Sequence, residues 1–181
     1  MSSDENPIEI RWLSHTEIED ELPIIAELNP EIPLEVLRER LVEMLKRDFR
    51  CVGAFIANKC VGISGVWIGY RFWCGKFLDV DNVIVTKEYR SAGIGKKMMD
   101  WIHRYAEEQQ INLSVLDAYV WNDQAHKFYM NQGYKILGYH FARKFIDLRK
   151  NGLSFDVEEE SSSARQNNSQ QEPPSSCGTF L

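Results

Sequence analysis

The sequence predicts a mixed α/β fold, in which a mostly antiparallel twisted sheet of six to seven strands is flanked by about four helices. Residues 51–58 and 61–77 are rich in β-branched and aromatic residues and are separated by a short turn at Asn58-Lys59, which is typical of a hairpin. Residues 77–86 form a further strand pattern that leads through a glycine-bearing loop into a helix. The apolar run at residues 113–121 follows that helix, so a right-handed crossover makes it parallel to the strand before it.

The N-terminal part is predicted to contain one strand and two helices. Residues 8–13 alternate apolar and polar side chains, as a half-buried strand does. Thr16 is predicted to cap the first helix. Near Leu34 a second helix is expected, because apolar residues there recur with helical spacing: Leu34, Leu37, Leu41, Met44 and Leu45.

The long second run of the hairpin contains four glycines, which predicts bulges or a second turn within residues 61–77. The same run holds the aromatic group Tyr70, Phe72 and Trp73. This group would form either an exposed rim beside a site or a buried cluster. Burial tendencies of such side chains favour the buried cluster.

The C-terminal part of the domain is predicted to hold two helices and a last strand. The helix beginning at Ile94 is strongly amphipathic. A shorter helix is capped by Asn122 or Asp123 and ends at Gly133. Residues 134–145 are aromatic-rich and predict a strand that completes the sheet.

Composition predicts one soluble domain over residues 1–149 and a disordered polar tail over residues 150–181, which are rich in Ser, Gln and Glu. The formal charge of -6 argues against a nucleic-acid partner. The sequence has no apolar run near the ~20 residues that span a bilayer, so no membrane partner is expected. The N-terminus is polar, and four cysteines show neither CxxC pairs nor zinc spacing, which predicts a cytoplasmic protein without a metal.

Two carboxylates, Asp79 and Asp81, interrupt the apolar strand at residues 77–86. On a regular strand they share a face with Val83 and Val85, unless a bulge intervenes. Burying ionised carboxylates in a central strand is costly without partners. They therefore indicate either a structural ion pair or a cleft in which they act.

The loop after this strand has the form of an anion site, because a strand, a glycine-bearing turn and a helix N-terminus direct backbone N–H groups at one point. Two nucleotide motifs do not fit it. A P-loop requires Gly and Ser or Thr where Arg90 and Lys97 stand, and a dinucleotide fingerprint starting at Gly93 requires Gly where Met98 stands.

The loop resembles the acyl-CoA loop of the GCN5-related N-acetyltransferases, whose pattern is Arg or Gln, two residues, Gly, one residue, then Gly or Ala. Residues 90–95 fit it, although Ser91 stands where many members have Gly and Lys87 where Pro is common. A second motif of this family, about thirty residues later, is matched in type and spacing by Asn122, Ala125, Phe128 and Tyr129. The resemblance covers residues 51–145.

The resemblance implies a GNAT-like fold in which strands four and five are parallel and splayed, with acetyl-CoA bound between them. It implies that the acyl-CoA diphosphate is held by the loop residues Arg90, Ser91, Ala92, Gly93, Ile94, Gly95 and Lys96. The pantetheine arm would pair with backbone groups of Val83, Ile84 and Val85 and be held by Asn122. Tyr129 would protonate the leaving thiolate, and Asp79 or Asp81 would take the proton of the amine, with Asp117 as a third carboxylate.

The sequence thus predicts an acyl-CoA-dependent N-acyltransferase that moves acetyl from acetyl-CoA to a primary amine by direct attack in a ternary complex. The acidic balance favours a cationic acceptor, either a small molecule or a protein lysine or N-terminus, and the protein would be a monomer or homodimer. The alternative is a non-catalytic acyl-CoA-binding regulatory module. Tyr129 and the carboxylates weigh against it, because a sensor needs neither.

Overall fold

The computed structural model describes residues 7–143 and 145. Its sheet has the strand order β1-β2-β3-β4-β5, and neighbouring strands are antiparallel except for β4 and β5, which are parallel. The strands are β1 (Glu9–Trp12), β2 (Arg50–Ile56), β3 (Lys59–Arg71), β4 (Gly75–Val85) and β5 (Leu113–Leu116). The predicted mixed sheet with parallel strands four and five is confirmed, but the expected six to seven strands are five in the described residues.

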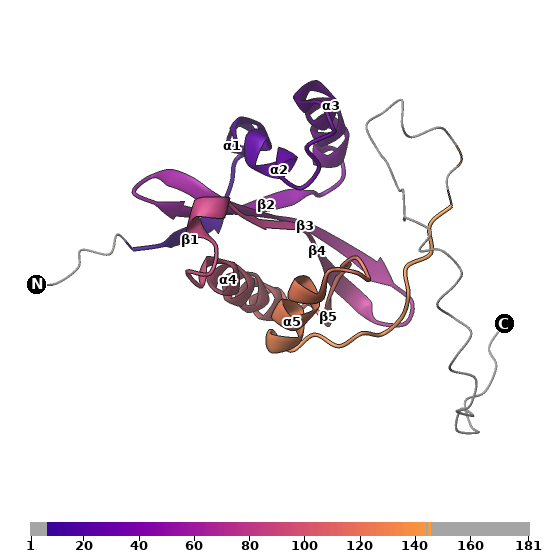
Figure 1. Ribbon diagram of the computed structural model, residues 1–181. Coiled ribbons are helices and arrows are strands. Elements are labelled where there is room, and N and C mark those ends of the chain that lie inside the picture. Colours follow the sequence, from indigo (N-terminus) through magenta and orange to yellow (C-terminus); the bar gives the residue numbers. More distant parts are fainter. Residues whose placement is uncertain (1–6, 144, 146–181) are drawn as a thin grey trace, which may run out of the picture.

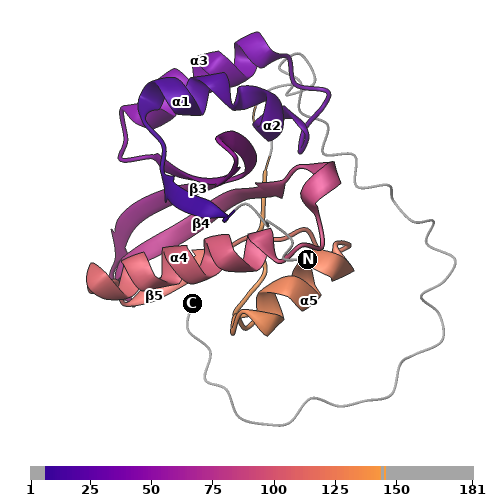
Figure 2. The ribbon, with the colours of Figure 1, turned by 90° about the vertical axis from the view of Figure 1, so that its left-hand side faces the viewer.

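Helices cover both faces of this sheet (Figure 1). One face is covered by α1 (His15–Asp20), α2 (Leu22–Ala26) and α3 (Leu34–Leu45). On the other face lie α4 (Ile94–Glu108) and α5 (Asp123–Asn131), and a short 3₁₀ turn, η1 (Lys87–Tyr89), precedes α4. Figure 2 shows α4 lying along the sheet with α5 beside it. No helix in the described part is long and apolar enough to cross a membrane.

Strand β4 contributes to the hydrophobic core on both faces of the sheet. Its residues Leu78 and Val80 pack with Met99 and Ile102 of α4. On the opposite face its residue Ile84 belongs to the cluster formed by the first three helices. Burial on both faces fixes the position of β4, and therefore of every side chain it carries, to within the tolerance of a packed core.

Two local predictions in the N-terminal half were wrong by one or two residues. Ser14, not Thr16, caps α1, in a capping box with Glu17. The hairpin turn between β2 and β3 is Ala57-Asn58 rather than Asn58-Lys59, because these two residues have positive φ values of 47° and 64°. A two-residue hairpin turn of this kind requires positive φ at both positions.

The prediction that Tyr70, Phe72 and Trp73 form a buried cluster was also wrong. All three are exposed, because they occupy the tip of the β3–β4 hairpin, which extends beyond the start of β5 at Leu113. The glycines in this run do accompany a second turn, as expected, since β3 ends at Arg71 and β4 starts at Gly75.

The last two predicted strands are shorter or absent. The strand expected at residues 113–121 ends at Leu116, and residues 134–143 and 145 form no strand. A strand needs a hydrogen-bonded neighbour, and in the described residues β5 pairs with β4 alone. The strand pattern of residues 134–145 is therefore present in the sequence without a partner in the structure.

The predicted tail, residues 150–181, lies outside the described residues. We expect a chain that ends at Lys150 to keep its melting temperature and turnover, because the deleted residues are too polar to form a core. Thermal unfolding and an acetyl transfer assay of the shortened chain test this boundary. A clear fall in either would show that part of the tail packs on the domain.

Candidate active site

The parallel strands β4 and β5 diverge inside the sheet. Their pairing runs from Phe77 opposite Leu113 to Val80 opposite Leu116, and β4 then continues to Val85 without a neighbour on that side among the described residues. The predicted pantetheine-binding residues Val83, Ile84 and Val85 lie on this unpaired stretch. Residues 81–85 therefore present a strand edge to which an extended amide-bearing ligand can pair.

A β-bulge at Asn82 changes which side chains line this edge. Asp81 lies opposite Gly65 and Ile84 lies opposite Ile63, so two residues of β4 oppose one residue of β3. Asn82 itself has φ 51°. The four residues expected to share a face are consequently split: Val83 and Val85 pack on the side of α4, away from Asp79 and Asp81.

The loop between β4 and α4 offers a row of free backbone donors. Gly93, with φ 77°, is the N-cap of α4, a left-handed conformation that glycine adopts without strain. In the described part of the chain, none of the backbone N–H groups from Ser91 to Lys96 donates to an acceptor. Thr86, at the base of the loop, has a buried Oγ1 that makes no hydrogen bond within the described residues. Unsatisfied polar groups gathered at a helix N-terminus fit an anionic ligand such as a diphosphate.

Arg90 fastens this loop to β4 and to the helical layer above it. Its Nε donates to the carbonyl oxygen of Val85 at 2.9 Å, and its Nη2 lies 3.5 Å from Oε2 of Glu27. Its backbone N–H donates to the carbonyl oxygen of Lys87 at 3.4 Å. Of the seven loop residues predicted to hold the diphosphate, Arg90 is thus tied to its own fold through side-chain and backbone donors, and the Lys96 ammonium is paired with Asp100.

The second predicted motif lies against the first. A Cβ built on Gly95 would come 3.4 Å from Cζ of Phe128, so glycine at this position permits the close approach of α5 to the start of α4. Asn122 is the N-cap of α5, as predicted, and its Oδ1 accepts from the N–H of Ala125 at 3.0 Å. Its side-chain carbonyl is therefore engaged, while its Nδ2 makes no hydrogen bond within the described residues.

Tyr129 lies beside Phe128 on α5 and is half-buried against the core on the α4 side of the sheet. Its hydroxyl has no hydrogen-bond partner among the described residues. Burial raises the pKa of Tyr129 to about 12, with smaller contributions from Tyr134 and Asp81. The phenol is therefore protonated at neutral pH and is free to donate.

Three carboxylates gather where β4 and β5 separate, and only Asp79 among them has no hydrogen-bond partner in the described structure. Asp81 accepts through Oδ2 from Nε1 of Trp67 at 3.4 Å, and Oδ2 of Asp117 lies 2.8 Å from Nδ1 of His140. Burial raises the pKa of Asp79 to about 6, and the charges of Asp117 and Asp81 add to the effect, whereas Arg71 and His140 oppose it. Asp79 is thus a carboxylate that takes up a proton near neutral pH.

Sequence reasoning missed a hydrogen-bonded group beneath α5. The hydroxyl of Tyr134 lies 3.0 Å from Nε2 of His103 on α4 and 2.6 Å from Oγ of Ser114 on β5. The ring of Tyr134 lies 6.0 Å from that of Tyr129, so this group fixes the chain next to the candidate acid. The three residues are far apart in sequence and no motif links them.

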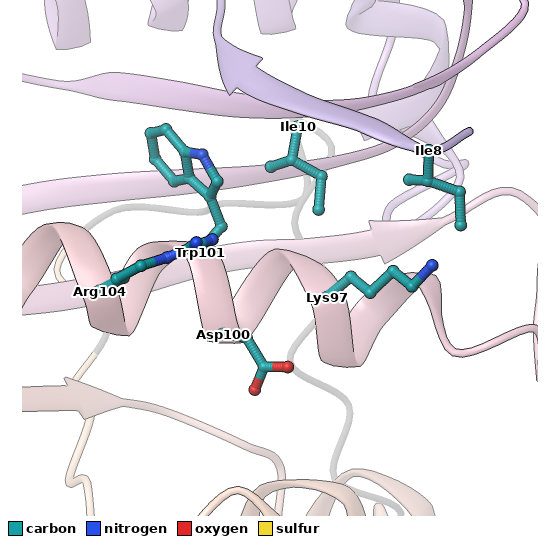
Figure 3. A pocket seen from close by; sticks show the side chains of 6 residues that line it. All are labelled: Ile8, Ile10, Lys97, Asp100, Trp101 and Arg104. Atoms are coloured by element: carbon teal, nitrogen blue, oxygen red, sulfur yellow. The ribbon is translucent and has the colours of Figure 1, made fainter.

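A separate hollow of about 280 Å³ lies between β1 and α4, and it contains none of the candidate residues. Figure 3 shows the Lys97 amine directed toward Ile8, while the carboxylate of Asp100 points away from the sheet. Asp100 is also paired with Lys96 at 2.6 Å. The residues lining this hollow are Ile8, Ile10, Lys97, Asp100, Trp101 and Arg104. The described residues likewise hold no group of three or more His, Cys, Asp or Glu side chains placed to bind a metal.

A family model described as the acetyltransferase (GNAT) family matches residues 9–134. The chain belongs to this family. The GNAT match begins at β1 and ends just after α5, so it includes both the free-donor loop and Tyr129. The resemblance noted in the sequence is confirmed. The mixed sheet with its diverging parallel strands β4 and β5 has the GNAT fold.

Relatives and solved structures agree with this assignment to the GNAT family. An uncharacterized N-acetyltransferase of Bacillus subtilis, YhdJ, is 24% identical over 132 residues, which is 72% of this chain and 93% of that protein. Thialysine N-epsilon-acetyltransferase of Bos taurus is 31% identical over 90 residues, covering 46% of this chain and 51% of that protein.

Among solved structures, glucosamine-6-phosphate N-acetyltransferase from Arabidopsis thaliana matches with a TM-score of 0.62 and 19% identity, over 77% of this chain and 99% of that chain. The aminoglycoside N-acetyltransferase AAC(6')-Iy, solved in complex with CoA, matches with a TM-score of 0.67 and 18% identity, over 81% of this chain and 100% of that chain. At this identity the likeness is one of fold.

Proposed function

We propose that this protein is an N-acetyltransferase that moves the acetyl group of acetyl-CoA to a primary amine by direct attack. The observation that carries the proposal is the unpaired edge of β4 at residues 81–85. The free-donor loop follows this edge along the chain. The protonated phenol of Tyr129 lies on the α4 side of the sheet, and the carboxylates Asp79 and Asp81 lie on the opposite side. Acyl transfer needs a site for the acetyl donor, a general acid and a general base. The candidates for these roles are the loop with the edge of β4, Tyr129, and the carboxylates of β4.

Acetyl-CoA would supply the activated acetyl thioester. The N–H groups of residues 91–96 and the positive end of α4 would bind its diphosphate. The edge of β4 at Val83 and Ile84 would pair with the amides of its pantetheine arm, as an added strand does. Asn122 would contribute its free Nδ2. Since Nε of Arg90 already donates to the carbonyl oxygen of Val85, the pairing of the pantetheine arm with β4 would stop before Val85.

We assign the two proton transfers to two side chains, of which one accepts a proton and the other donates one. Asp79 would take a proton from the acceptor ammonium, directly or through water, because its raised pKa makes it a stronger base than an ordinary aspartate. The amine nitrogen would then bond to the acetyl carbon as the carbon–sulfur bond breaks. Tyr129 would give its proton to the departing thiolate. Asp81, held by Trp67, is the weaker candidate for the base.

The acceptor is proposed to be cationic, because Asp79, Asp81 and Asp117 surround the point where it would enter. The names of two relatives fit such an acceptor: thialysine N-epsilon-acetyltransferase and spermidine/spermine N(1)-acetyltransferase-like protein 1 of Homo sapiens, which is 29% identical over 73 residues. A small amine is therefore the first class to test, followed by a protein lysine or N-terminus.

A panel of amines and peptides, assayed for release of free CoA by the full chain, tests the proposal. We expect turnover with at least one cationic primary amine and none with its N-acetylated form. Tight acetyl-CoA binding without turnover on any acceptor would instead favour the non-catalytic acyl-CoA-binding regulatory module. Turnover retained in a double variant, Tyr129→Phe with Asp79→Asn, would overturn the assigned roles.

Substitution in the free-donor loop should weaken donor binding. Gly93→Val places a β-branched side chain at φ 77°, which valine does not adopt without strain, so the loop must change shape. We expect acetyl-CoA affinity, measured by calorimetry, to fall by at least ~10-fold, or about 1.4 kcal/mol. Gly138→Val is the matched control, because its Cβ meets nothing within 4 Å and lies outside the loop. Equal affinity in both variants would contradict the assignment of the loop.

A further inference from the structure

The segment that follows α5 contacts the region of β5 from both faces of the sheet. Tyr134 packs in the cluster on the α4 side, and its hydroxyl lies 2.6 Å from Oγ of Ser114. Further along the segment, which Figure 1 shows as the orange trace leaving α5, Nδ1 of His140 lies 2.8 Å from Oδ2 of Asp117. Side chains alternate between the faces along a strand, so Ser114 and Asp117 are directed to opposite faces. The segment therefore brings His140 to the face away from α4.

Asp79 lies on this same face. It is opposite Val115 in the pairing of β4 with β5, and Asp117 is the next residue after Val115 that is directed to that face. Burial is the main reason for the raised pKa of Asp79, the charge of Asp117 adds to it, and the charge of a protonated His140 opposes it. Charges in salt solution act on one another over short distances only. Asp79, Asp117 and His140 thus form one group where the acceptor would enter.

The contact with Asp117 determines which nitrogen of the His140 ring is free. An ionised carboxylate can only accept hydrogen bonds, so Nδ1 carries the hydrogen atom and Nε2 of the neutral ring keeps a lone pair. Nε2 makes no hydrogen bond within the described residues. The side chains of His140 and Asp117 are 70% and 71% exposed, so Nε2 is open to an acceptor and to solvent. An exposed pair of this kind contributes little to the stability of the fold.

The acetyl transfer proposed above, on which this inference rests, removes two protons from the acceptor nitrogen. A primary ammonium loses one proton before its lone pair can attack, and the cationic nitrogen formed by the attack loses another as it becomes an amide. Asp79 is assigned the first of these protons. Tyr129 gives a proton to the thiolate and takes none from the nitrogen. A second base is therefore needed beside Asp79.

We propose that Nε2 of His140 takes this second proton and that Asp117 is the positioning residue that holds the ring. As the nitrogen–carbon bond forms and the carbon–sulfur bond breaks, the proton passes from the nitrogen to Nε2, and the carboxylate of Asp117 stabilises the resulting imidazolium. The thiolate takes the proton of Tyr129. After the products leave, Asp79 and His140 release two protons to solvent and Tyr129 regains one. One proton is thus released for each ammonium that becomes an amide.

Chemical rescue of a His140→Ala variant tests the proposal, with an amine that the unmodified chain acetylates. We expect kcat to fall by about 10²- to 10⁴-fold. Acetyl-CoA affinity and melting temperature should not change, because the side chain is exposed. Added imidazole should restore part of kcat in a saturable manner, since an exposed position admits a base from solution. His15→Ala, at an exposed position of α1, is the matched control and should neither lose activity nor respond to imidazole.

A double variant tests the role of Asp117. Asp117→Asn should lower kcat, because the amide does not stabilise the imidazolium. If Asp117 acts through His140, the double variant should be no slower than His140→Ala alone. Additive losses, an unchanged kcat in His140→Ala, or a loss that imidazole does not restore would each overturn the proposal, while turnover by the unmodified chain would still support acetyl transfer. Failure of the unmodified chain to acetylate any amine would overturn both the proposed function and this inference.

Discussion

Tyr129→Phe is expected to lower kcat by about 10²- to 10⁴-fold while leaving acetyl-CoA affinity nearly unchanged, since general-acid steps contribute in this range. The ring, and with it the contact with Phe128 and the packing of α5, is kept in this variant. What it removes is a hydroxyl that has no hydrogen-bond partner among the described residues, so the ground state loses little. A proton that is needed only as the thioester breaks should appear in turnover and not in affinity.

Stability distinguishes this role from a purely structural one. A tyrosine whose hydroxyl were satisfied in the core would lose about 1 kcal/mol of stability on the same change and keep its kcat. Tyr70→Phe, on the exposed hairpin tip, controls for the loss of a hydroxyl elsewhere and should change neither quantity. Reduced stability with unchanged kcat in Tyr129→Phe would defeat the catalytic assignment.

Asp79→Asn is expected to lower kcat/KM for the acceptor by a similar ~10²- to 10⁴-fold and to raise stability at neutral pH. The unmodified enzyme should gain activity as pH rises through about 6, because Asp79 must lose its proton before it can accept one. The asparagine variant should lose this dependence. A pH profile of kcat/KM over the acid range measures both effects.

The gain in stability follows from the direction of the pKa shift. Because burial raises the pKa of Asp79 from 3.8 to about 6, the folded state binds more protons than the unfolded state between these values. The contribution of Asp79 to stability therefore falls as pH rises through this window, and the neutral amide avoids that cost. Asp20→Asn, on exposed α1, is the control and should shift neither the profile nor the melting temperature. An inactive variant that is also less stable would indicate a structural carboxylate.

The fold could be predicted where local pattern and tertiary environment agree. The periodic apolar residues of α4 and the alternating ones of β1 are each buried on one face. The strand expected at residues 8–13 is observed at Glu9–Trp12, and α4 begins at Ile94 as expected. Residues 134–145 have an equally clear strand pattern, but strand formation depends on a neighbour and not on the segment alone. Tyr70 and Phe72 were misplaced for a related reason, because hydrophobicity does not tell whether a hairpin extends past the sheet that would cover it.

For the site, sequence indicated residue types and their order along the chain, and the structure adds the relations between them. The loop and Tyr129 belong to short motifs with fixed spacing, which is why they could be singled out. The bulge at Asn82 had only a weak signal, an asparagine within a strand, although asparagine tolerates positive φ better than most residues. The choice of Asp79 over Asp81 depends on Trp67, and the support of Tyr129 depends on Tyr134, and neither contact leaves a mark in local sequence.

The diverging strands have a consequence for how the folded protein responds to its surroundings. On the proposed function, the backbone groups of residues 81–84 that point away from β3 would be hydrated in the free protein and would join a continuous ladder only when the donor arm binds beside β4. The co-substrate then acts as a removable strand, and its binding free energy adds to the free energy of unfolding in proportion to the logarithm of its concentration. The resistance of this domain to unfolding would thus follow the supply of acetyl-CoA.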